Sequence, residues 1–499
     1  MKITIMVGKP GKTFLLQLMI LFALAMTPVQ SSVAQTRHRA ELQRQVRSEF
    51  LHAWNGYKQY AWGHDDLKPL TKSYHDWYAE PLLMTPVDAL DTMTLMGLNS
   101  EAKSTREYIA THLSFDKDIS VQNFEITIRL LGGLLSNYEM TGDKRLLNLA
   151  EDLGNRLLPV FNSPTGLPYR YVNLKTGAVR GNVTNPAEAG TLLIEFGTLA
   201  RLTHRQIFYD KAKRALVEIY NRRSPIGLVG TWINVETGQW TDTDSHISGA
   251  IDSYYEYLLK CAILFDDQDC RRMWEASIAA INKYLSVTRI VEDEGTPAKH
   301  ELWYAHADMN NGKWTAMTYG ALDAFFPAVL ALSGDLNRAS LLQESSFQMW
   351  TKEGIEPEEF DYQAMTIKSP GYPLRPEIVE STYYLFHYAE ISKSKSFRPG
   401  TRPSSSAQMP PLNGSAVELD PNHYQQMGET MWRDFVKNCR TDEGYAALKS
   451  VITKEKSDSM QSFLFAETFK YFYLLFAPRS TLNFDTVVFN TEAHPMRRK

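Results

Sequence analysis

The feature that most constrains the fold is a helical hydrophobic pattern that recurs along most of the chain. Apolar residues repeat at i, i+3, i+4 and i+7, and Gly, Asp or Pro closes each run. One helical hairpin cannot bury its apolar face alone, so hairpins that recur roughly every fifty to seventy residues must pack on one another. Closed into a ring they form an (α/α) barrel, and stacked in a line they form an open solenoid. The clearest predicted helices cover residues 126–140, 189–202, 253–264, 324–332, 381–391 and 468–476.

Two stretches interrupt this pattern with a strand-like alternation. Residues 167–177 and 227–238 alternate apolar and polar side chains and then read Asn-x-x-Thr-Gly. An alternation that ends in such a turn predicts a β-hairpin. Each stretch is followed by an acidic residue and a helix. We therefore expect β-hairpins to decorate the end of the helical body at which those helices begin.

The size and charge of the chain narrow the classes of function. A length of 499 residues fits one large barrel or about three smaller domains. We expect a single domain over residues 35–499, because the pattern after the Pro- and Ser-rich segment 395–419 continues the pattern before it. That segment is predicted to be a surface insertion loop. A net charge of −4 offers no basic surface for nucleic acid, and we expect a monomer.

The first 34 residues resemble a secretory signal. Lys2, Lys9 and Lys12 precede an apolar core at 14–26, and Ser32-Val33-Ala34 supplies small residues for cleavage before Gln35. The alternative is a membrane anchor, for which the apolar run is short. We expect an exported protein, periplasmic or secreted, with no membrane attachment after cleavage.

The chain contains three cysteines, which are too few for a disulfide framework. An odd count leaves at least one thiol unpaired in a monomer. Cys261 and Cys270 are close enough in sequence to form a bridge, but the sequence alone does not decide whether they do.

Acidic residues stand repeatedly where apolar helices begin. An acid at a helix N-terminus caps free N–H groups and complements the helix dipole, and that is the ordinary explanation for any one of them. Several on helices that converge at one end of a ring would repel one another, which is unfavourable unless a cation or a polyol ligand uses them. The residues are Glu125, Glu188, Asp252, Glu377 and Glu467, with Glu380 one turn after Glu377.

Paired carboxylates of this kind suit the hydrolysis of a glycosidic bond. One protonated acid donates to the leaving oxygen, and a second carboxylate activates water. Glu125 has Arg129 one turn later, and Glu377 lies beside Arg375. These two glutamates are the best-placed candidates. Their separation, which would distinguish inversion from retention, does not follow from the sequence.

The C-terminal segment predicts a second functional feature. An apolar run, Val487-Val488-Phe489, leads into the polar turn 490–494. Thr491 offers a carbonyl and a hydroxyl, and Glu492 adds a carboxylate. Oxygen ligands of this kind suit Ca²⁺. The alternative is an exposed turn with no ligand.

Ordered motifs over residues 45–495 resemble glycoside hydrolase family 47, the class I α-mannosidases. Their order and number carry the resemblance more than any one of them does. The matching stretches are 52–57 (HAWNGY), 62–69 (WGHDDLKP), 87–92 (VDALDT), 124–135 (FEITIRLLGGLL), 252–260 (DSYYEYLLK), 375–381 (RPEIVES), 462–468 (SFLFAET) and 489–495 (FNTEAHP).

The resemblance implies an all-α fold, an (α/α)7 barrel with a C-terminal β-hairpin that rises inside it as a plug. It implies an inverting exo-α-1,2-mannosidase that acts on terminal mannose of mannose-rich glycans. Thr491 would bind Ca²⁺ through its carbonyl and hydroxyl, with waters and two sugar hydroxyls as the other ligands. Glu125 would be the acid, acting through a water, Glu377 the base, and Asp252 a third essential carboxylate. The mannose site would be lined by Arg129, Glu188, Glu256, Glu358, Arg375, Glu380, Phe463, Glu467 and Glu492, with Phe463 stacked on the sugar.

Two other readings remain. A non-catalytic mannose-glycan-binding protein could use the same fold, although none of the three carboxylates is lost. Another (α/α)-barrel enzyme, such as a polysaccharide lyase, would want a Tyr or Lys base near the acids, and none stands out. One departure concerns residues 320–327, where many family members carry a His and a disulfide Cys. This chain has neither there and looks more like the degradation-enhancing branch of the family.

Overall fold

The structure, a computed structural model, describes residues 12–292, 298–393 and 418–498, without the side chains of 12–34 and 393. The predicted signal segment therefore lies outside the described side chains. The predicted insertion 395–419 lies outside the described residues except for its last two positions. No helix in the described part combines the length and apolar character needed to cross a membrane.

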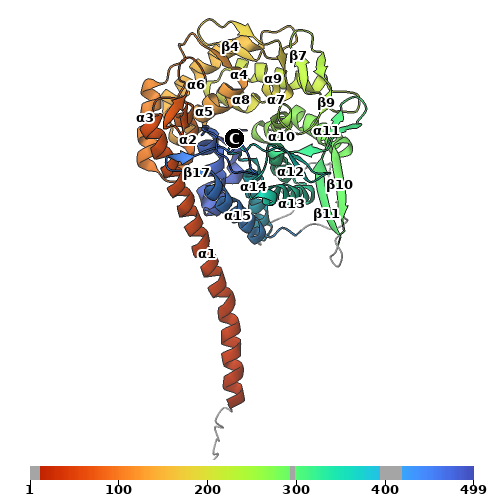
Figure 1. Ribbon diagram of the computed structural model, residues 1–499. Coiled ribbons are helices and arrows are strands. Elements are labelled where there is room, and N and C mark those ends of the chain that lie inside the picture. Colours follow the sequence, from red (N-terminus) through yellow and green to blue (C-terminus); the bar gives the residue numbers. More distant parts are fainter. Residues whose placement is uncertain (1–11, 293–297, 394–417, 499) are drawn as a thin grey trace, which may run out of the picture.

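An inner ring of helices surrounds the C-terminus, which is marked near the centre of Figure 1. Most of these helices are buried on nearly every side, so their sequences are apolar all round rather than on one stripe. In chain order they are α2 (Met84–Leu95), the run α4 (Asn123–Ile126), η1 (Thr127–Leu131) and α5 (Gly132–Thr141), then α8 (Leu193–Thr203), α10 (Asp252–Phe265), α12 (Phe326–Ser333), α14 (Glu377–Lys393), and the run η4 (Leu464–Thr468) and α16 (Phe469–Phe476).

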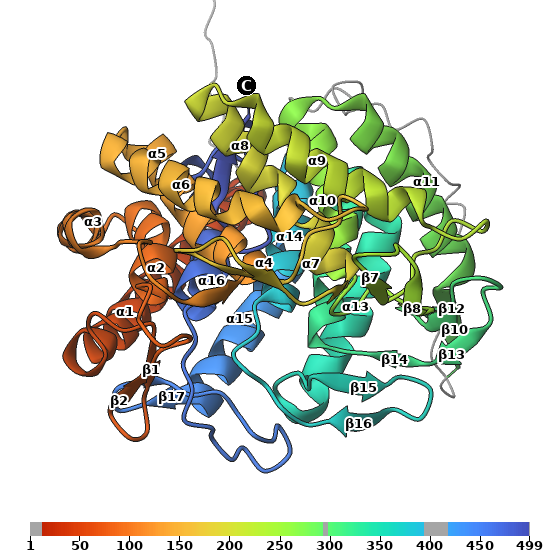
Figure 2. The ribbon, with the colours of Figure 1, turned by 90° about the horizontal axis from the view of Figure 1, so that it is seen from above.

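Contacts between consecutive inner helices close this ring. Helix α2 packs on α5, α5 on α8, α8 on α10, α10 on α12, α12 on α14 and α14 on α16, and η4 returns to α2. An outer helix covers each inner one, in the order α3, α6, α9, α11, α13, α15 and α1, as Figures 1 and 2 show. The described residues thus confirm the (α/α)7 barrel. The outer helices are α1 (Lys12–Tyr60), α3 (Asn99–His112), α6 (Lys144–Leu157), α9 (Gln206–Asn221), α11 (Gln268–Tyr284), α13 (Leu336–Glu353) and α15 (Pro421–Cys439).

The predicted helices are present, with one break and with changes of helix type, among them the π turn η1 inside the run 126–140. The run 189–202 is split, because α7 (Pro186–Gly190) ends before α8 begins. At the break, Thr191 Oγ1 donates to Ser253 Oγ over 2.8 Å, which fixes the chain against α10. The run 324–332 begins as a 3₁₀ turn, η3 (Ala321–Phe325), before α12. Other short 3₁₀ turns are η2 (Leu158–Phe161), η5 (Arg479–Thr481) and η6 (Phe484–Thr486).

The two predicted β-hairpins are confirmed, each as part of a three-stranded sheet. In both, the Asn side chain of the Asn-x-x-Thr-Gly motif closes the turn: Asn173 Oδ1 accepts from the amides of Lys175 and Thr176, and Asn234 does the same two and three residues on. The sheets are β3 (Ser120–Gln122), β4 (Tyr171–Asn173) and β5 (Val179–Arg180), and β6 (Val183–Thr184), β7 (Trp232–Asn234) and β8 (Trp240–Asp242).

The remaining sheets are small, and all except the C-terminal hairpin lie in connections between helices. Two are three-stranded and the others are hairpins. They are β9 (Asp244–Ser245), β12 (His306–Asp308) and β13 (Trp314–Ala316); β14 (Thr318–Tyr319), β15 (Glu359–Asp361) and β16 (Thr366–Ser369); β1 (Asp66–Lys68) and β2 (Ser73–His75); β10 (Ser286–Val291) and β11 (Lys299–Tyr304); β17 (Arg440–Thr441) and β18 (Gly444–Tyr445); and β19 (Val487–Phe489) and β20 (Pro495–Arg497).

The C-terminal hairpin β19–β20 lies inside the ring, as the resemblance implied. Strand β19 contacts α10, and β20 contacts α5 on another side of the barrel. The turn between them is buried, with Asn490 and His494 fully enclosed. The alternative of an exposed turn is therefore wrong.

The structure also resolves the pairing that the sequence left open. Cys261 of α10 and Cys270 of α11 form a disulfide across the short connection between an inner helix and its outer partner, while Cys439 is a free, buried thiol.

Candidate active site

The acidic residues predicted at helix beginnings do begin the inner helices. Asp252 is the first residue of α10 and Glu377 the first of α14, while Glu125 lies in α4. Two of the inner helical runs contain π-helical turns, η1 and η4, which carry Arg129 and Glu467. Short π segments inside α-helices are common at functional sites, because they re-aim side chains and free a carbonyl. One end of the barrel thus gathers these acids.

Arg129 connects this acid cluster to the C-terminal hairpin. Its Nε donates to Glu125 Oε2 over 3.0 Å, and its Nη1 donates to Glu492. The guanidinium also packs over two aromatic rings, 5.1 Å from the Trp77 centroid and 5.7 Å from that of Phe463. Burial opposes its charge, but the surrounding carboxylates, Glu492 foremost, raise the pKa of Arg129 above its ordinary value. The side chain therefore stays cationic and fixes Glu125 in place.

The pKa values of Asp252 and Glu377 lie well above the ordinary value of a carboxyl group. Burial raises the pKa of each to about 7. The charge of Arg375 opposes the shift at Glu377, while Glu358 and Asp252 add to it. At Asp252 the nearby charges of Glu256 and Asp323 reinforce burial. Both groups are therefore poised to gain or lose a proton near neutral pH, as general acid–base catalysts must be.

Three more predicted carboxylates crowd the same space. Burial raises the pKa of Glu380 and of Glu492 to about 8, and that of Glu467 well above its usual range, with the charges of Glu492, Glu377 and Glu380 adding to the shift at Glu467. Glu256 forms an ion pair with Lys260 one turn along α10. The structure thus brings together all but one of the predicted acids.

Two predicted glutamates are held by arginines instead. Glu358 forms a bidentate pair with Arg375, with both N–O distances at 2.9 Å. Glu188 forms a similar pair with Arg170, accepts from Gln122 Nε2 over 3.1 Å, and has its amide capped by Asn185. Within the described residues, Glu188 is thus the predicted acid whose hydrogen bonds and ion pairs all lead away from the acid cluster. Its position is that of an acid at a capped helix start.

The hairpin turn is anchored to the inner helices by buried polar contacts. Asn490 Nδ2 donates to the Ile128 carbonyl in the π turn η1 over 2.8 Å and to Glu195 Oε1 over 2.7 Å. Lys470 Nζ donates to the Ala493 carbonyl over 2.6 Å. Gly132 permits this approach, because a Cβ at that position would lie 2.6 Å from Asn490 Nδ2. The turn is therefore fixed in register against η1 and α16.

The turn presents oxygen atoms that fit a hard cation. The amide of Thr491 donates to Tyr257 Oη over 3.3 Å, but within the described residues neither its carbonyl nor its hydroxyl has a hydrogen-bond partner. Carbonyl and hydroxyl oxygens with carboxylates nearby are the donors that Ca²⁺ prefers. The residues present thus fit the ion that the resemblance implies, and Thr491 is the residue that would hold it.

A buried charge cluster beneath the turn was not predicted. His494 Nδ1 lies 2.7 Å from Asp91 Oδ2 and its Nε2 lies 3.3 Å from Asp88 Oδ1, while Lys470 pairs with Asp91 at 2.8 Å. All four side chains are fully buried. Asp88 and Asp91 stand at i and i+3 in an otherwise apolar helix, so they share one face. That spacing was the signal in the sequence that could have identified them.

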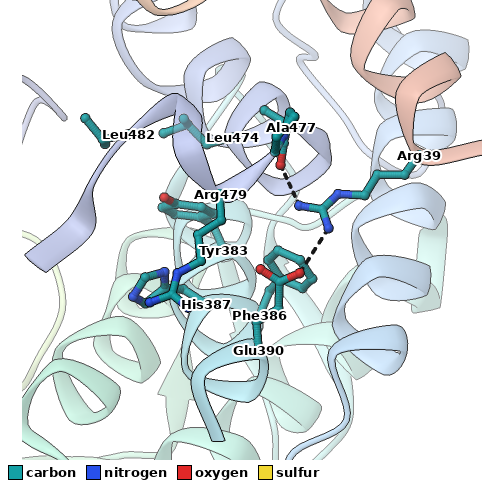
Figure 3. Close-up of a pocket in the computed structure, with 10 residues that line it drawn as sticks. Arg39, Tyr383, Phe386, His387, Glu390, Leu474, Ala477, Arg479 and Leu482 are labelled. Carbon is teal, nitrogen blue, oxygen red and sulfur yellow. Dashed lines mark hydrogen bonds and ion pairs between the residues drawn. The ribbon is translucent and has the colours of Figure 1, made fainter. Parts of the chain in front are cut away.

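A separate pocket lies away from the acids, between α1, α14 and the segment after α16 (Figure 3). Arg39 crosses it and donates to Glu390 Oε1 over 3.0 Å and to the Ala477 carbonyl. Glu390 lies near the opposite end of α14 from Glu377, about 20 Å along the helix. The pocket contains none of the predicted site residues, and its contacts tie α1 to the barrel.

Comparison with known proteins settles the family. A family model described as "Glycosyl hydrolase family 47" matches residues 49–398 and 420–498. The chain belongs to glycosyl hydrolase family 47. Among solved structures, the "alpha-1,2-mannosidase from Trichoderma reesei" aligns over 92% of this chain and 99% of that chain, with a TM-score of 0.79 and 25% sequence identity. The predicted resemblance and fold are thereby confirmed.

Two relatives from different branches resemble this family 47 chain about equally. The Arabidopsis thaliana "Mannosyl-oligosaccharide 1,2-alpha-mannosidase MNS1" is 33% identical over 91% of this chain and 78% of the relative. The Mus musculus "ER degradation-enhancing alpha-mannosidase-like protein 2" is 32% identical over 92% of this chain and 78% of the relative. Identity alone therefore does not assign the chain to either branch.

Proposed function

We propose that this family 47 chain is an inverting exo-α-1,2-mannosidase that removes terminal α-1,2-linked mannose from mannose-rich glycans. The names of its relatives support the substrate class. The observation that carries the proposal is the convergence of Glu125, Asp252 and Glu377, from three inner helices, on the end of the barrel closed by the hairpin turn.

Glu377 and Glu125 supply the base and the acid of a single-displacement reaction at the anomeric carbon. Glu377 takes a proton from water as that water attacks the anomeric carbon, and the bond from that carbon to the glycosidic oxygen breaks. Glu125, oriented by Arg129, supplies a proton to the departing oxygen through a water. A base must be ionised to act, and the pKa of Glu377, raised by burial to about 7, makes its ionised fraction sensitive to pH near neutrality.

The other predicted site residues bind the sugar, hold the ion or share the proton. Asp252 is a third essential carboxylate, whose pKa, raised by burial to about 7, lets it share a proton with the site. Phe463, buried beside Arg129, offers an apolar face to the ring. Bound at Thr491, Ca²⁺ would orient two sugar hydroxyls and offset the carboxylate charge. Glu256, Glu380, Glu467 and Glu492 accept hydrogen bonds from sugar hydroxyls or from waters.

The test is hydrolysis of α-1,2-mannobiose, with the first anomer released followed by NMR. Wild-type protein should release β-mannose, while Glu125→Gln and Glu377→Gln should each lose most of the rate and keep the wild-type melting temperature. Glu359→Gln, at an exposed carboxylate near Glu358, is the matched control and should retain full activity. Binding of mannobiose without any release by wild-type protein would instead support the glycan-binding alternative.

We further propose an exported monomer, with residues 35–499 as one catalytic domain. The support for export is the signal-like sequence of residues 1–34, and the support for one domain is the single closed ring of helices. Expression of the full chain followed by N-terminal sequencing and light scattering tests both points. A mature protein that begins at Gln35 and has the mass of one chain is the expected result, and an uncleaved membrane-bound form would refute it.

A further inference from the structure

Glu356 is a fully buried carboxyl group for which the proposed reaction has no use. Its side chain is 0% exposed, and among the described residues neither of its oxygens has a hydrogen-bond partner. Oε2 of Glu377, the proposed base, is also buried and without a partner. A buried polar atom without a partner costs free energy that native structures rarely tolerate, so two carboxyl groups that contain such atoms and influence each other's charge call for a joint explanation.

The local chain geometry joins the two segments that carry these carboxyl groups. Glu356 lies two residues before Glu358, and Glu377 lies two residues after Arg375. Glu358 and Arg375 are joined by their bidentate ion pair. The segment before Glu377 is held further by the hydrogen bond from the Glu358 amide to the Gly371 carbonyl, at 2.9 Å. The two short segments are thus clamped side by side, with a glutamate on each side of the clamp.

Within the described residues no donor reaches either oxygen of Glu356, and the neighbouring hydroxyls are directed elsewhere. The hydroxyl of Tyr319 bonds the Asp323 carbonyl and Ser346, and that of Tyr372 donates to the Arg375 carbonyl. Arg375 directs Nε and Nη2 to Glu358. A charged Glu356 would therefore be a buried anion without a donor, which is far more costly than a neutral acid.

We propose that Glu356 is a positioning residue that stays protonated and donates a hydrogen bond, directly or through one water, to Oε2 of Glu377. This inference rests on the proposed role of Glu377 as the base. The bond satisfies both unpartnered groups at once. It also favours the ionised form of Glu377, because a donor to a carboxylate stabilises its charge. A second carboxyl group thereby keeps the base available where burial alone would hold it protonated.

The charges around Glu356 and Glu377 favour a protonated Glu356 and an ionised Glu377. Burial, followed by the charges of Glu377 and Glu358, raises the pKa of Glu356 well above its usual range, against the opposing charge of Arg375. Glu377 therefore ionises first. The titratable groups that face the pair from the neighbouring elements are Arg375, Glu358, Asp252, Glu380, Glu467 and the two phenols Tyr319 and Tyr372.

The first test measures kcat/KM for α-1,2-mannobiose as a function of pH. Its acid limb is the low-pH range in which activity falls because the base Glu377 becomes protonated. Glu356→Leu removes the donor and should move the limb upward by about one pH unit, with kcat at pH 6 falling about tenfold and KM little changed. Glu356→Gln keeps a neutral N–H donor and should leave the limb within a few tenths of a unit. If Glu356 were ionised instead, Glu356→Gln would remove a repulsive charge and move the limb downward, which would overturn the proposal. Glu359→Gln should match wild type.

The second test needs no turnover. The infrared difference spectrum between wild type and Glu356→Gln at pH 7 should show the carbonyl band of one protonated carboxylic acid in the wild-type protein. A carboxylate band in its place would refute the inference. If wild-type protein fails to cleave mannobiose, the proposed function fails while this spectrum still decides the protonation of Glu356. If cleavage proceeds but either test gives the contrary result, the inference alone fails.

Discussion

Replacing Asn490 with Ala should release the hairpin turn while the barrel stays folded. The Asn490 side chain makes four buried hydrogen bonds. It donates to the Ile128 carbonyl and to Glu195, and it accepts from the amides of Glu492 and His494 at 3.0 and 2.7 Å. No outer helix takes part in these bonds. Their loss therefore affects the position of Thr491 without unpacking any helix pair.

The magnitude follows from the number of bonds. A net contribution of about 1 kcal/mol for each buried hydrogen bond gives about 4 kcal/mol for the set. At 1.4 kcal/mol for each factor of ten, local opening of the turn should become roughly a thousandfold more frequent. The two amides that lose their acceptor report this opening directly, because hydrogen exchange measures it at single residues.

Hydrogen exchange read by NMR or by mass spectrometry of the C-terminal peptide is the assay. Protection at Glu492 and His494 should fall by two to three orders of magnitude, roughly, while amides in α10 keep theirs. Asn483→Ala is the matched control, because exposed Asn483 caps only the short turn η6. Unchanged protection at Glu492 and His494 in Asn490→Ala would refute the view that this side chain fixes the turn. So would an equal loss of protection throughout α10.

Two further predictions concern the same turn and its surroundings. Gly132→Ala would add a Cβ 2.6 Å from Asn490 Nδ2 and so displace the turn that carries Thr491, and Ca²⁺ should no longer raise the melting temperature. Gly371→Ala is the control, because its Cβ would have no atom nearer than 3.5 Å, and it should keep the rise. An unaltered Ca²⁺ effect in Gly132→Ala would count against close packing at this position. Burial raises the pKa of Asp252 and Glu377 to about 7 and that of Glu380 to about 8, whereas these carboxyl groups have a pKa of about 4 in an unfolded chain. Between these values the folded state binds more protons than the unfolded state. The free energy of unfolding in EDTA should therefore fall as the pH rises from about 5 to 8. Melting curves with EDTA and with CaCl₂ test this point, and a melting temperature in EDTA that rises over that interval would contradict it.

Much of the fold could be predicted because its signals are local. The repeated helical pattern and the Asn-x-x-Thr-Gly turns depend on neighbours in sequence, and Asn173 and Asn234 close their turns as the motif requires. The beginnings of the inner helices could be predicted in the same way. Ring closure needed more, since pattern alone left the solenoid open and only the resemblance to family 47 decided for a barrel.

The parts that could not be predicted depend on contacts between distant segments. The π turns η1 and η4 have the same apolar spacing as α-helix, and in η1 the Ile128 carbonyl accepts a hydrogen bond from Asn490, hundreds of residues away. The break at Thr191 likewise depends on Ser253. Glu188 follows the same sequence rule as Glu125, yet its recorded partners are Arg170, Gln122 and Asn185. An acidic residue at the start of an inner helix therefore predicts its position at one end of the barrel. It does not predict which side chain the acid will pair with.

The distribution of buried cations explains why the site needs a ligand of its own. Four cations near the acids in the described structure already have carboxylate partners: Arg129 has Glu125 and Glu492, Lys260 has Glu256, Arg375 has Glu358, and Lys470 has Asp91. Among the described residues, Glu377, Glu380, Glu467 and Asp252 form no ion pair with a cation, and burial raises the pKa of each. Protonation relieves this excess charge at low pH, and a divalent ion with a polyol relieves it near neutrality. The same imbalance that weakens the ligand-free fold as pH rises therefore favours binding of a cation and a sugar.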